Sequence, residues 1–234
     1  MPNLKYKGQF QAMICLNANL PKREVIEKFS GIPILAADGA ATQLIEMGIM
    51  PDYVIGDLDS FLSSKHKAAI PIDKLIHKPD QDANDFEKNL DYALAHNWNN
   101  IIVLGIHGGQ MEHTLNNWSV FIKYSRKMNL MLYDLERYAF SLHEAGDYVL
   151  DTYEGEMISL IPQPKACVIL KNFQWNLNEE VLKLGEREGA RNISTHNKVY
   201  IKLIEGELLI FTKARIPKID PSSYQAQIEQ GSAQ

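Results

Sequence analysis

The sequence predicts an α/β fold, with an N-terminal domain built on an open, mostly parallel sheet and a C-terminal all-β sandwich domain. In the first half, short apolar runs alternate with segments of helical periodicity, which is typical of βαβ units. Beyond residue 135 the helical periodicity is lost, and short strand-like runs are separated by turn signals. We therefore expect an α/β domain over 1–134, a β-sandwich over 135–213 and a flexible tail over 214–234.

Each element of the first half follows from its pattern. The strands are short apolar runs, at Ala12–Leu16, Ile34–Ala37, Tyr53–Ile55, Lys74–His77, Ile101–Leu104 and Leu130–Tyr133. The helices carry apolar residues at helical spacing, at Arg23–Phe29, Ala40–Met47, Asn84–His96 and Thr114–Lys127. Pro21 is expected in the first turn of the first helix, and Gly48 is well placed to end the second.

The second half is expected to consist of short strands. They are Tyr138–His143, Tyr148–Leu150, Met157–Ile161, Cys167–Leu170, Val199–Leu203 and Glu207–Phe211. Turn signals lie at 144–147, 153–156 and 205–207. Short strands at regular spacing favour an antiparallel sandwich or barrel. The segment after Ala214 has too few apolar residues to pack, so we expect it to be mobile.

Composition narrows the classes of function. Of the net charge of −5, residues 52–91 supply −4, from nine acidic and five basic side chains, so the rest of the chain is close to neutral. A nucleic-acid-binding protein would show a basic face, and a local cation site explains the charge better. Cys15 and Cys167 lie in apolar runs, which indicates buried thiols in a reducing compartment. With neither a leader nor about 18 consecutive apolar residues, we expect a cytoplasmic protein that does not bind membranes.

Two acidic clusters mark the candidate site, Gly56–Ser60 and Asp80–Phe86. Both follow a predicted strand, where open α/β sheets form their ligand crevice. Carboxylates gathered there repel one another unless a cation lies between them. Mg²⁺ carrying the phosphates of a nucleotide is the usual cation. The clusters therefore predict a phosphoryl-type transferase.

Each cluster also has a purely structural interpretation. In an extended segment Asp57 and Asp59 would point to the same side and reach one cation, but an Asp-rich turn would have the same sequence. Asp82 is a good N-cap for a helix beginning near Ala83, with Asp85 in its first turn. Capping leaves Asp80 and Gln81 unexplained, which favours a site that includes at least Asp85.

Three further segments are candidates for ligand contacts. The glycine-rich loop Gly105–Gln110 lies between a strand and a helix, where backbone N–H groups can bind an anion. His107 in this loop and the nearby His113 could each act as a base or donate a hydrogen bond to a phosphate, although a lone histidine is more often structural. Ala37–Ala41 resembles a phosphate-binding turn, but is neither a P-loop nor a GxGxxG motif. Trp175 could stack on a flat ring, although a tryptophan in a β domain is more often core.

In this order, the motifs resemble those of the thiamine pyrophosphokinase family, over nearly the whole chain to about residue 211. Ala37–Thr42 resembles the family's Ala-Asp-Gly-Gly-Ala-Asn, and Gly56–Ser60 its Gly-Asp-Phe-Asp-Ser. Pro79–Phe86 resembles Pro-Asp-Gln-Asp-x-Thr-Asp-Phe, with Asn84 in place of threonine. Gly108–His113 resembles Gly-Gly-Arg-x-Asp-His, and Phe173–Leu177 resembles Leu-x-Trp-x-Leu.

The resemblance implies a homodimer that transfers diphosphate from MgATP to the hydroxyl of thiamine, giving thiamine diphosphate and AMP. It implies that Asp57, Asp59 and Asp85 are catalytic and hold Mg²⁺. Residues expected to bind the ATP co-substrate are Asp38, Gly39, Gly108, Gly109, Gln110, Glu112 and His113. Residues expected to bind thiamine are Gln81, Trp175 and Asn192, with the tryptophan stacked on thiamine in a pocket shared across the dimer.

The chain departs from the family pattern at its basic positions. Gln110 replaces the arginine of Gly-Gly-Arg, Glu112 replaces the aspartate, and Thr42 and Gln43 stand where Asn and Arg are usual. Glutamine can bond a phosphate oxygen but carries no charge, so Lys78 or another base is expected to compensate.

Three alternatives stay open at this point. The first is a diphosphokinase for another heterocyclic alcohol, such as a hydroxymethyl pterin. The second is a non-catalytic thiamine or nucleotide sensor. The third is a phosphohydrolase using Asp57-Leu58-Asp59-Ser60, for which no convincing late acidic pair is found.

Overall fold

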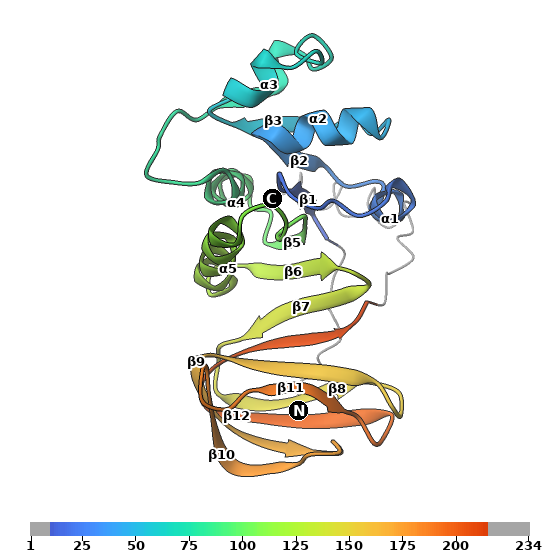
Figure 1. The fold of residues 1–234 in the computed structure, drawn as a ribbon, viewed down its shortest axis with the longest axis vertical. Coiled ribbons are helices and arrows are strands. Elements are labelled where there is room, and N and C mark those ends of the chain that lie inside the picture. Colours follow the sequence, from blue (N-terminus) through green and yellow to red (C-terminus); the bar gives the residue numbers. More distant parts are fainter. Residues whose placement is uncertain (1–9, 215–234) are drawn as a thin grey trace, which may run out of the picture.

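The computed structural model describes residues 10–214, so of the predicted tail only Ala214 is among the described residues. Its strands form one continuous sheet in the order β10-β9-β12-β7-β6-β5-β1-β2-β3-β4, with β11 paired to β9 and β8 to β12. Figure 1 shows the α/β part above and the strand-rich part below. The predicted fold class, an α/β sheet followed by an all-β part, is confirmed.

The upper part of the sheet is parallel. Its strands are β1 (Ala12–Cys15), β2 (Ile34–Ala37), β3 (Tyr53–Gly56), β4 (Leu75–His77), β5 (Asn100–Leu104) and β6 (Asn129–Asp134). All neighbouring pairs from β6 to β4 are parallel. The inner strands β1 and β5 are apolar and almost completely buried, because helices cover both faces of the sheet. All six strands lie where the sequence predicts them, within one or two residues at their ends.

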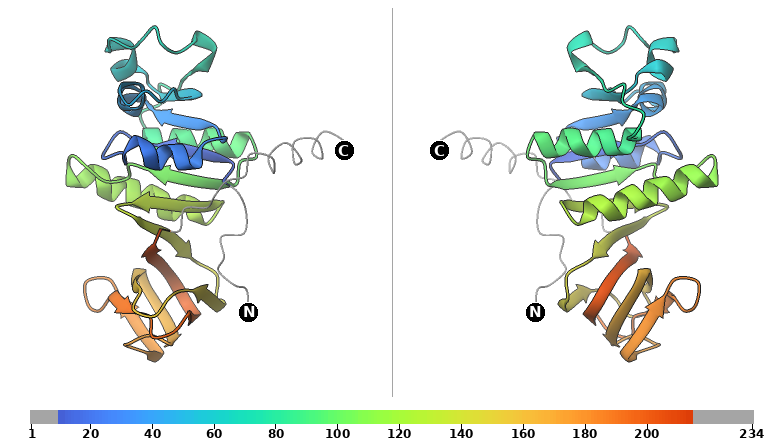
Figure 2. Two further views of the ribbon diagram at one scale, coloured as in Figure 1. Left: turned by 90° about the vertical axis from the view of Figure 1, so that its right-hand side faces the viewer. Right: turned by 90° about the vertical axis from the view of Figure 1, so that its left-hand side faces the viewer.

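Helices connect these strands. They are α1 (Arg23–Ile26, continued by a 3₁₀ turn over Glu27–Phe29), α2 (Asp38–Glu46), α3 (Asp59–Ser63), α4 (Asp85–Ala95) and α5 (Met111–Ser125), with a further 3₁₀ turn at Ile72–Lys74. In Figure 2, α4 and α5 lie side by side on one face of the sheet and α1 lies on the other. Gly48 follows α2 with a φ of 75°, so it ends that helix as expected.

Some helix starts differ from the prediction. Pro21 precedes the N-cap Lys22, so it lies outside the first turn of α1. Asp82 is not the N-cap of α4; Asn84 is, and its side chain accepts a hydrogen bond from the Glu87 backbone N at 2.9 Å. Asp85 is therefore the first residue of α4, which places its carboxylate in the first turn of the helix. The sequence did not predict α3, which is only one turn long.

The lower part contains β7 (Arg137–Leu142), β8 (Gly146–Asp151), β9 (Met157–Lys171), β10 (Leu177–Lys183), β11 (Gly189–Ile193) and β12 (Lys198–Lys213). The sequence predicted two strands each for β9 and β12, but each is one long strand. The Lys198–Leu203 half of β12 pairs with β8, and its Leu208–Lys213 half pairs with β7. Both halves also pair with β9. The long strands therefore pass from one layer of the sandwich to the other.

Gly206 makes this bend possible. It lies between two register shifts in the β12–β9 pairing and has a φ of 88°. A Cβ on Gly206 would lie 2.0 Å from the Lys165 carbonyl oxygen, so only glycine fits. The two layers enclose a second apolar core, formed by residues such as Leu160, Val168 and Ile201. The strands β10 and β11 escaped prediction because their sequences, rich in Glu, Lys and Arg, lack clear apolar alternation.

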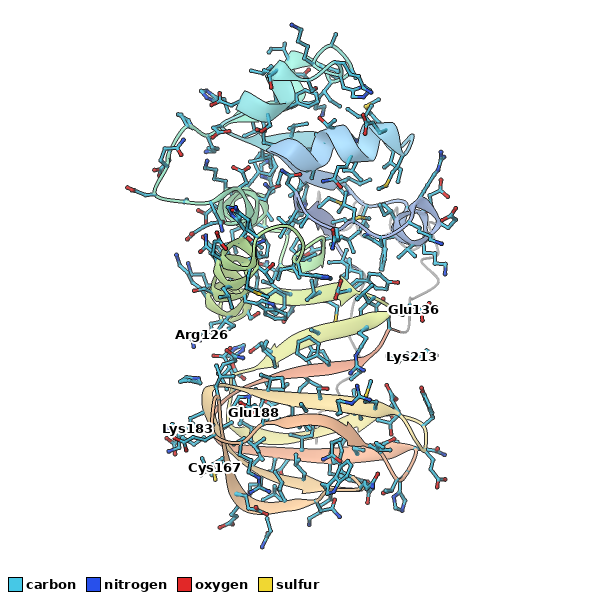
Figure 3. The ribbon with its side chains drawn as sticks, viewed as in Figure 1. Arg126, Glu136, Cys167, Lys183, Glu188 and Lys213 are labelled. Atoms are coloured by element: carbon cyan, nitrogen blue, oxygen red, sulfur yellow. The ribbon has the colours of Figure 1, made fainter. Side chains whose placement is uncertain are left out.

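Among the described residues, the two parts are joined by the antiparallel pair β6–β7, by apolar packing such as that of Trp118 in α5 on Phe211 in β12, and by the Arg126–Glu207 ion pair. The predicted domain boundary falls in the β6–β7 turn, and it stays a prediction because the sheet continues through this point. Arg126 lies at the end of α5 that faces the β part (Figure 3) and binds the buried Glu207 of β12.

Both cysteines are free, as the sequence predicts. Cys15 is buried in β1, and burial raises the pKa of its thiol to about 12. Cys167 in β9 is only partly buried. In residues 10–214, no helix is long and apolar enough to cross a bilayer.

Candidate active site

Three carboxylates lie close together where β2 and β3 end. Asp38 is the first residue of α2, Asp57 follows β3, and Asp85 is the first residue of α4. Gly56, the last residue of β3, allows this approach. A Cβ on Gly56 would lie 3.0 Å from Asp85 Oδ1 and 3.1 Å from Asp38 Cβ. The carboxyl ends of neighbouring parallel strands thus bring together acids that are far apart in the sequence.

These acids influence one another electrostatically. Burial raises the pKa of Asp85, the nearby Lys88 acts against this increase, and the charges of Asp57 and Asp38 raise the pKa further. A half-buried carboxylate beside two others is a favourable place for a cation.

Asp38 shapes the site through the backbone. Its side chain is buried, with Oδ2 accepting from the Ser60 backbone N and Oδ1 from the Phe61 backbone N, both at 2.8 Å. These two N–H groups belong to the first turn of α3, whose donors would otherwise be unsatisfied. The carboxylate of Asp38 therefore holds the segment that carries Asp57. Its direct contact with the nucleotide stays a prediction.

The expectation that Asp57 and Asp59 share one side of an extended segment is wrong. Leu58 between them is left-handed, with a φ of 67°, and Asp59 is the first residue of α3. Leu58 turns its side chain into the core while Asp59 is exposed, and burial of the leucine accounts for the unusual backbone. Asp57 Oδ1 faces the backbone N of Asp59 at 3.4 Å. Alternation along a strand therefore does not align these two carboxylates.

The second acidic cluster forms an exposed turn. Asp80 Oδ1 accepts from the Asp82 backbone N at 2.9 Å, and Gln81 Nε2 donates to the Pro79 carbonyl oxygen at 3.3 Å. Within residues 10–214, Asp85 is the one acid of this cluster that interacts with the charges of Asp38 and Asp57. The assignment of Gln81 to thiamine binding stays a prediction.

The glycine-rich loop after β5 packs against the loop after β1. The Asn19 backbone N donates to the His107 carbonyl oxygen at 3.0 Å, and a Cβ on Gly108 would lie 2.8 Å from that same nitrogen. His107 Nδ1 lies 3.0 Å from Asp134 Oδ1. The strand order reverses between β1 and β5, because β2 lies on one side of β1 and β5 on the other. This is the switch point where open α/β sheets bind ligands.

The remaining predicted ATP-binding residues line the start of α5. Gln110 is the N-cap residue without a capping side-chain bond, and its Oε1 lies 3.1 Å from His113 Nε2. Gly109 has a φ of 68° and leaves open space where a Cβ would be. Glu112 is exposed in the first turn. The structure brings these residues to one helix N-terminus, while their nucleotide contacts stay predictions.

The sequence analysis missed Asn17, which follows β1. Gln43 Nε2 donates to Asn17 Oδ1 at 2.9 Å, and a Cβ on Gly39 would lie 2.2 Å from Asn17 Nδ2. The neutral amide of Asn17 therefore lies against the first turn of α2. It is bonded to Gln43, which stands where the family pattern has an arginine. The polar Asn-Ala-Asn stretch directly after the first predicted strand was the available signal.

Lys88 and Asn89 were also missed, although both are buried in α4. Lys88 is 6% exposed, and its Nζ lies 3.4 Å from Asp85 Oδ1. Asn89 Nδ2 donates to the Ile55 carbonyl oxygen at 3.3 Å and to the Asp85 carbonyl oxygen at 2.8 Å, which ties β3 to the first turn of α4. The signal for Asn89 was its place on the helical stripe that holds Phe86 and Ala93.

Trp175 lies on the loop between β9 and β10. Its side chain is 56% exposed, so the alternative of a core tryptophan is wrong. The buried Asn192 holds this loop, since its Nδ2 donates to the Trp175 carbonyl oxygen at 2.8 Å and its Oδ1 accepts from the Trp175 backbone N at 3.2 Å. Asn192 thus positions the indole, and its own contact with thiamine stays a prediction.

Comparison with known proteins supports the resemblance found in the sequence. A model of the thiamin pyrophosphokinase catalytic domain matches residues 31–133, the stretch that carries Asp38, Asp57, Asp85 and the glycine-rich loop. The resemblance of the chain to the thiamine pyrophosphokinase family is thereby confirmed.

Individual relatives of this family are distant in sequence but similar in length. Thiamine pyrophosphokinase of Bacillus subtilis is 24% identical over 182 residues, which cover 75% of this chain and 85% of the relative. Thiamin pyrophosphokinase 1 of Caenorhabditis elegans is 25% identical over 185 residues, covering 72% of this chain and 74% of the relative.

Solved structures of thiamine pyrophosphokinases share the fold. The enzyme from yeast superimposes with a TM-score of 0.74 at 15% identity, over 93% of this chain and 92% of its own. The enzyme from Geobacillus thermodenitrificans gives a TM-score of 0.73 at 20% identity, over 89% of this chain and 99% of its own.

Proposed function

We propose that this protein transfers a diphosphate group from ATP to the hydroxyl of thiamine, giving thiamine diphosphate and AMP. The observation that carries the proposal is the meeting of Asp57 and Asp85 beside Gly56, within the segment that matches the family's catalytic domain. The relatives, which are thiamine pyrophosphokinases, support thiamine as the acceptor.

The carboxylates suit Mg²⁺, a hard cation that prefers oxygen ligands. Within residues 10–214, no three His, Cys, Asp or Glu side chains are arranged to hold a metal ion by themselves. Mg²⁺ that arrives with a nucleotide needs only one or two carboxylates, because phosphate oxygens and waters complete its shell. Asp57 and Asp85 would hold it, with Asp59 as a further candidate. When bound, the ion supplies positive charge that neutralises the phosphates.

The residues of the chain position the triphosphate. The first turns of α2 and α5 present backbone N–H groups at the carboxyl edge of the sheet, and the helix dipoles favour anions there. Gly39 and Gly108 keep the backbone close to Asn17 and Asn19. The amides of Asn17 and Gln43 add hydrogen-bonding groups without charge. Positioning and charge neutralisation supply most of the rate in reactions of this kind.

The chemical step is a displacement at phosphorus. The hydroxyl oxygen of thiamine attacks the β-phosphorus of ATP, the bond from that phosphorus to the α,β-bridging oxygen breaks, and AMP leaves. One of the site aspartates accepts the hydroxyl proton. Trp175, exposed and held by Asn192, offers an aromatic face to the thiamine rings. The proposal includes a homodimer that shares the thiamine pocket, and a cytoplasmic location.

One assay tests the proposal. ATP is incubated with the protein and Mg²⁺, with and without thiamine, and AMP and ADP are resolved by chromatography. Thiamine-dependent formation of AMP and thiamine diphosphate is expected. Formation of ADP, or ATP consumption that ignores thiamine, would contradict it.

Two further measurements separate the alternatives. A mass-spectrometric screen that includes hydroxymethyl pterin would identify another heterocyclic alcohol as acceptor. If calorimetry shows that thiamine and nucleotide bind but no product forms, the protein is a sensor instead.

A further inference from the structure

Lys88 is a buried cation inside the acidic site. It belongs to α4, one turn after Asp85, and only 6% of its side chain is exposed. A buried ammonium is rare, because desolvation disfavours its charge unless a partner compensates. Its presence therefore needs an explanation that packing alone does not supply.

The contacts of Lys88 are incomplete. An ammonium carries three N–H donors. Among the described side chains, its one hydrogen-bond partner is Asp85 Oδ1, at 3.4 Å, which is a long hydrogen bond. Two donors are left over at a place where the proposed function puts a triphosphate. Lys88 is thus the buried positive group that the neutral Gln43 and Gln110 do not provide.

Lys88 and a metal ion would use the same carboxylate. Asp85 is half-buried and is repelled by Asp38 and Asp57, and Lys88 offsets this repulsion. A divalent cation on Asp85 would in turn be repelled by the ammonium. That repulsion is relieved once a polyphosphate lies beside both cations, because its oxygens can bind Lys88 and the metal together.

We propose that Lys88 is a counter-ion of Asp85 that disfavours the binding of free divalent metal to this carboxylate. When the metal binds as its complex with a nucleotide, Lys88 donates its remaining N–H groups to the phosphates. The inference rests on the proposed function, because it takes the nucleotide to bind at Asp57 and Asp85. It makes Lys88 a residue that selects the metal–nucleotide complex over the bare metal ion.

The test measures metal binding without any reaction. Binding of free Mn²⁺ to the whole protein is followed by electron paramagnetic resonance, for the wild type and for Lys88→Met, Lys88→Gln and Lys88→Arg. The control is Lys67→Met, which removes the same charge from an exposed lysine outside the acidic cluster. Circular dichroism shows which variants fold.

Removal of the charge has two opposite effects in this proposal. In Lys88→Met and Lys88→Gln, free Mn²⁺ should bind about tenfold more tightly, because the competing cation is gone. A non-hydrolysable ATP analogue with Mg²⁺ should bind about tenfold more weakly to the same variants. Lys88→Arg should retain most of the wild-type behaviour toward both ligands, and Lys67→Met should change neither.

Mn²⁺ binding that is unchanged or weaker in both neutral variants would overturn the inference. So would nucleotide binding that does not weaken. Failure of the proposed function gives a different result, namely no thiamine-dependent AMP from the wild type. The metal measurement does not involve thiamine, so the two failures are distinguishable. The glutamine variant keeps the test valid if the methionine variant does not fold.

Discussion

Arg126 binds one carboxylate oxygen of Glu207 through two N–H groups, and this contact ties the α/β part to the β part. Nε and Nη2 of Arg126 donate to Glu207 Oε2 at 3.0 and 2.6 Å. The other oxygen, Oε1, accepts from Ser141 Oγ at 2.6 Å. The glutamate is buried in β12 while the arginine ends α5, so this contact joins elements that the sheet alone would connect only through β6 and β7.

Replacement of Arg126 by alanine is expected to destabilise the protein. Of its side-chain partners in the part of the chain that the structure describes, the buried carboxylate of Glu207 would keep Ser141 alone, which costs about 1–3 kcal/mol. Urea unfolding measures the change. Lys183→Ala is the matched control, because the Lys183–Glu186 ion pair is exposed and should contribute about 0–1 kcal/mol. Equal effects of the two variants would show that the Arg126 contact has no special role.

Asp57→Asn should abolish most turnover without loss of stability. Asp57 is half-buried and contributes a carboxylate to the proposed metal site, whereas within residues 10–214 its side chain accepts only a long hydrogen bond, from the Asp59 backbone N at 3.4 Å. Activity with MgATP should fall by orders of magnitude, since positioned charge supplies most of the rate, while the Tm stays close to that of the wild type. Steady-state kinetics and calorimetry measure both. Full activity in this variant would remove Asp57 from the site.

Unlike Asp57→Asn, Asp38→Asn should lower the stability of the protein. Both oxygens of Asp38 accept from backbone N–H groups of α3, and asparagine can supply only one acceptor oxygen. The remaining N–H would face an NH₂ group in a buried place, at a cost of about 1–3 kcal/mol. Unfolding in urea tests the loss. A variant as stable as the wild type would mean that the capping role is unimportant.

Gly56→Ala should damage the site through crowding. The new methyl group would lie 3.0 Å from Asp85 Oδ1 and 3.1 Å from Asp38 Cβ, so the two acids must move apart. The acids would have to move by a few tenths of an ångström. Because a displacement of about 1 Å can cost about 10²-fold in rate, we expect a smaller fall in turnover, of about tenfold. Gly146→Ala is the control, because its methyl group would make only ordinary contacts from 3.7 Å. Comparable activity of the two alanine variants would argue against a narrow site at Gly56.

Trp175→Ala should weaken thiamine binding selectively. The indole is 56% exposed, so its removal should change stability little. Loss of a stacking partner should raise the KM for thiamine about tenfold or more and leave the KM for ATP unchanged. Asn192→Ala should raise the same KM because the Trp175 loop loses two hydrogen bonds. An equal rise in both KM values would contradict a thiamine-specific role.

The two cysteines should differ in reactivity. Cys15 is fully buried, so its thiol is inaccessible to a reagent in solution. Burial also raises its pKa to about 12, so the thiol stays protonated and unreactive at neutral pH. Cys167 is partly accessible. Iodoacetamide at neutral pH should modify Cys167 first, as followed by mass spectrometry of the intact and digested protein. Earlier modification of Cys15 would mean that β1 opens to solvent.

Periodicity in the sequence was enough to predict the alternation of strands and helices up to Asp134, apart from the one-turn helix α3, and the change to an all-β pattern beyond it. It also placed Asp57 and Asp85 at the carboxyl edge of the sheet, because a parallel strand followed by a polar turn must end there. Gly48 shows the same local logic, since a residue with a φ of 75° after a helix favours glycine. These features depend on neighbours in the chain.

Tertiary structure decided the features that depend on distant residues. Leu58 is left-handed because its side chain enters the core, which overrides the extended segment expected around it. The bend of β12 requires Gly206 to lie against Lys165 of β9, and Lys88 becomes buried only when α4 packs on β3 and places Asp85 beside Gly56. Local sequence determines which backbone conformation is accessible. Burial, and contacts between segments far apart in the chain, determine which side chains share a site.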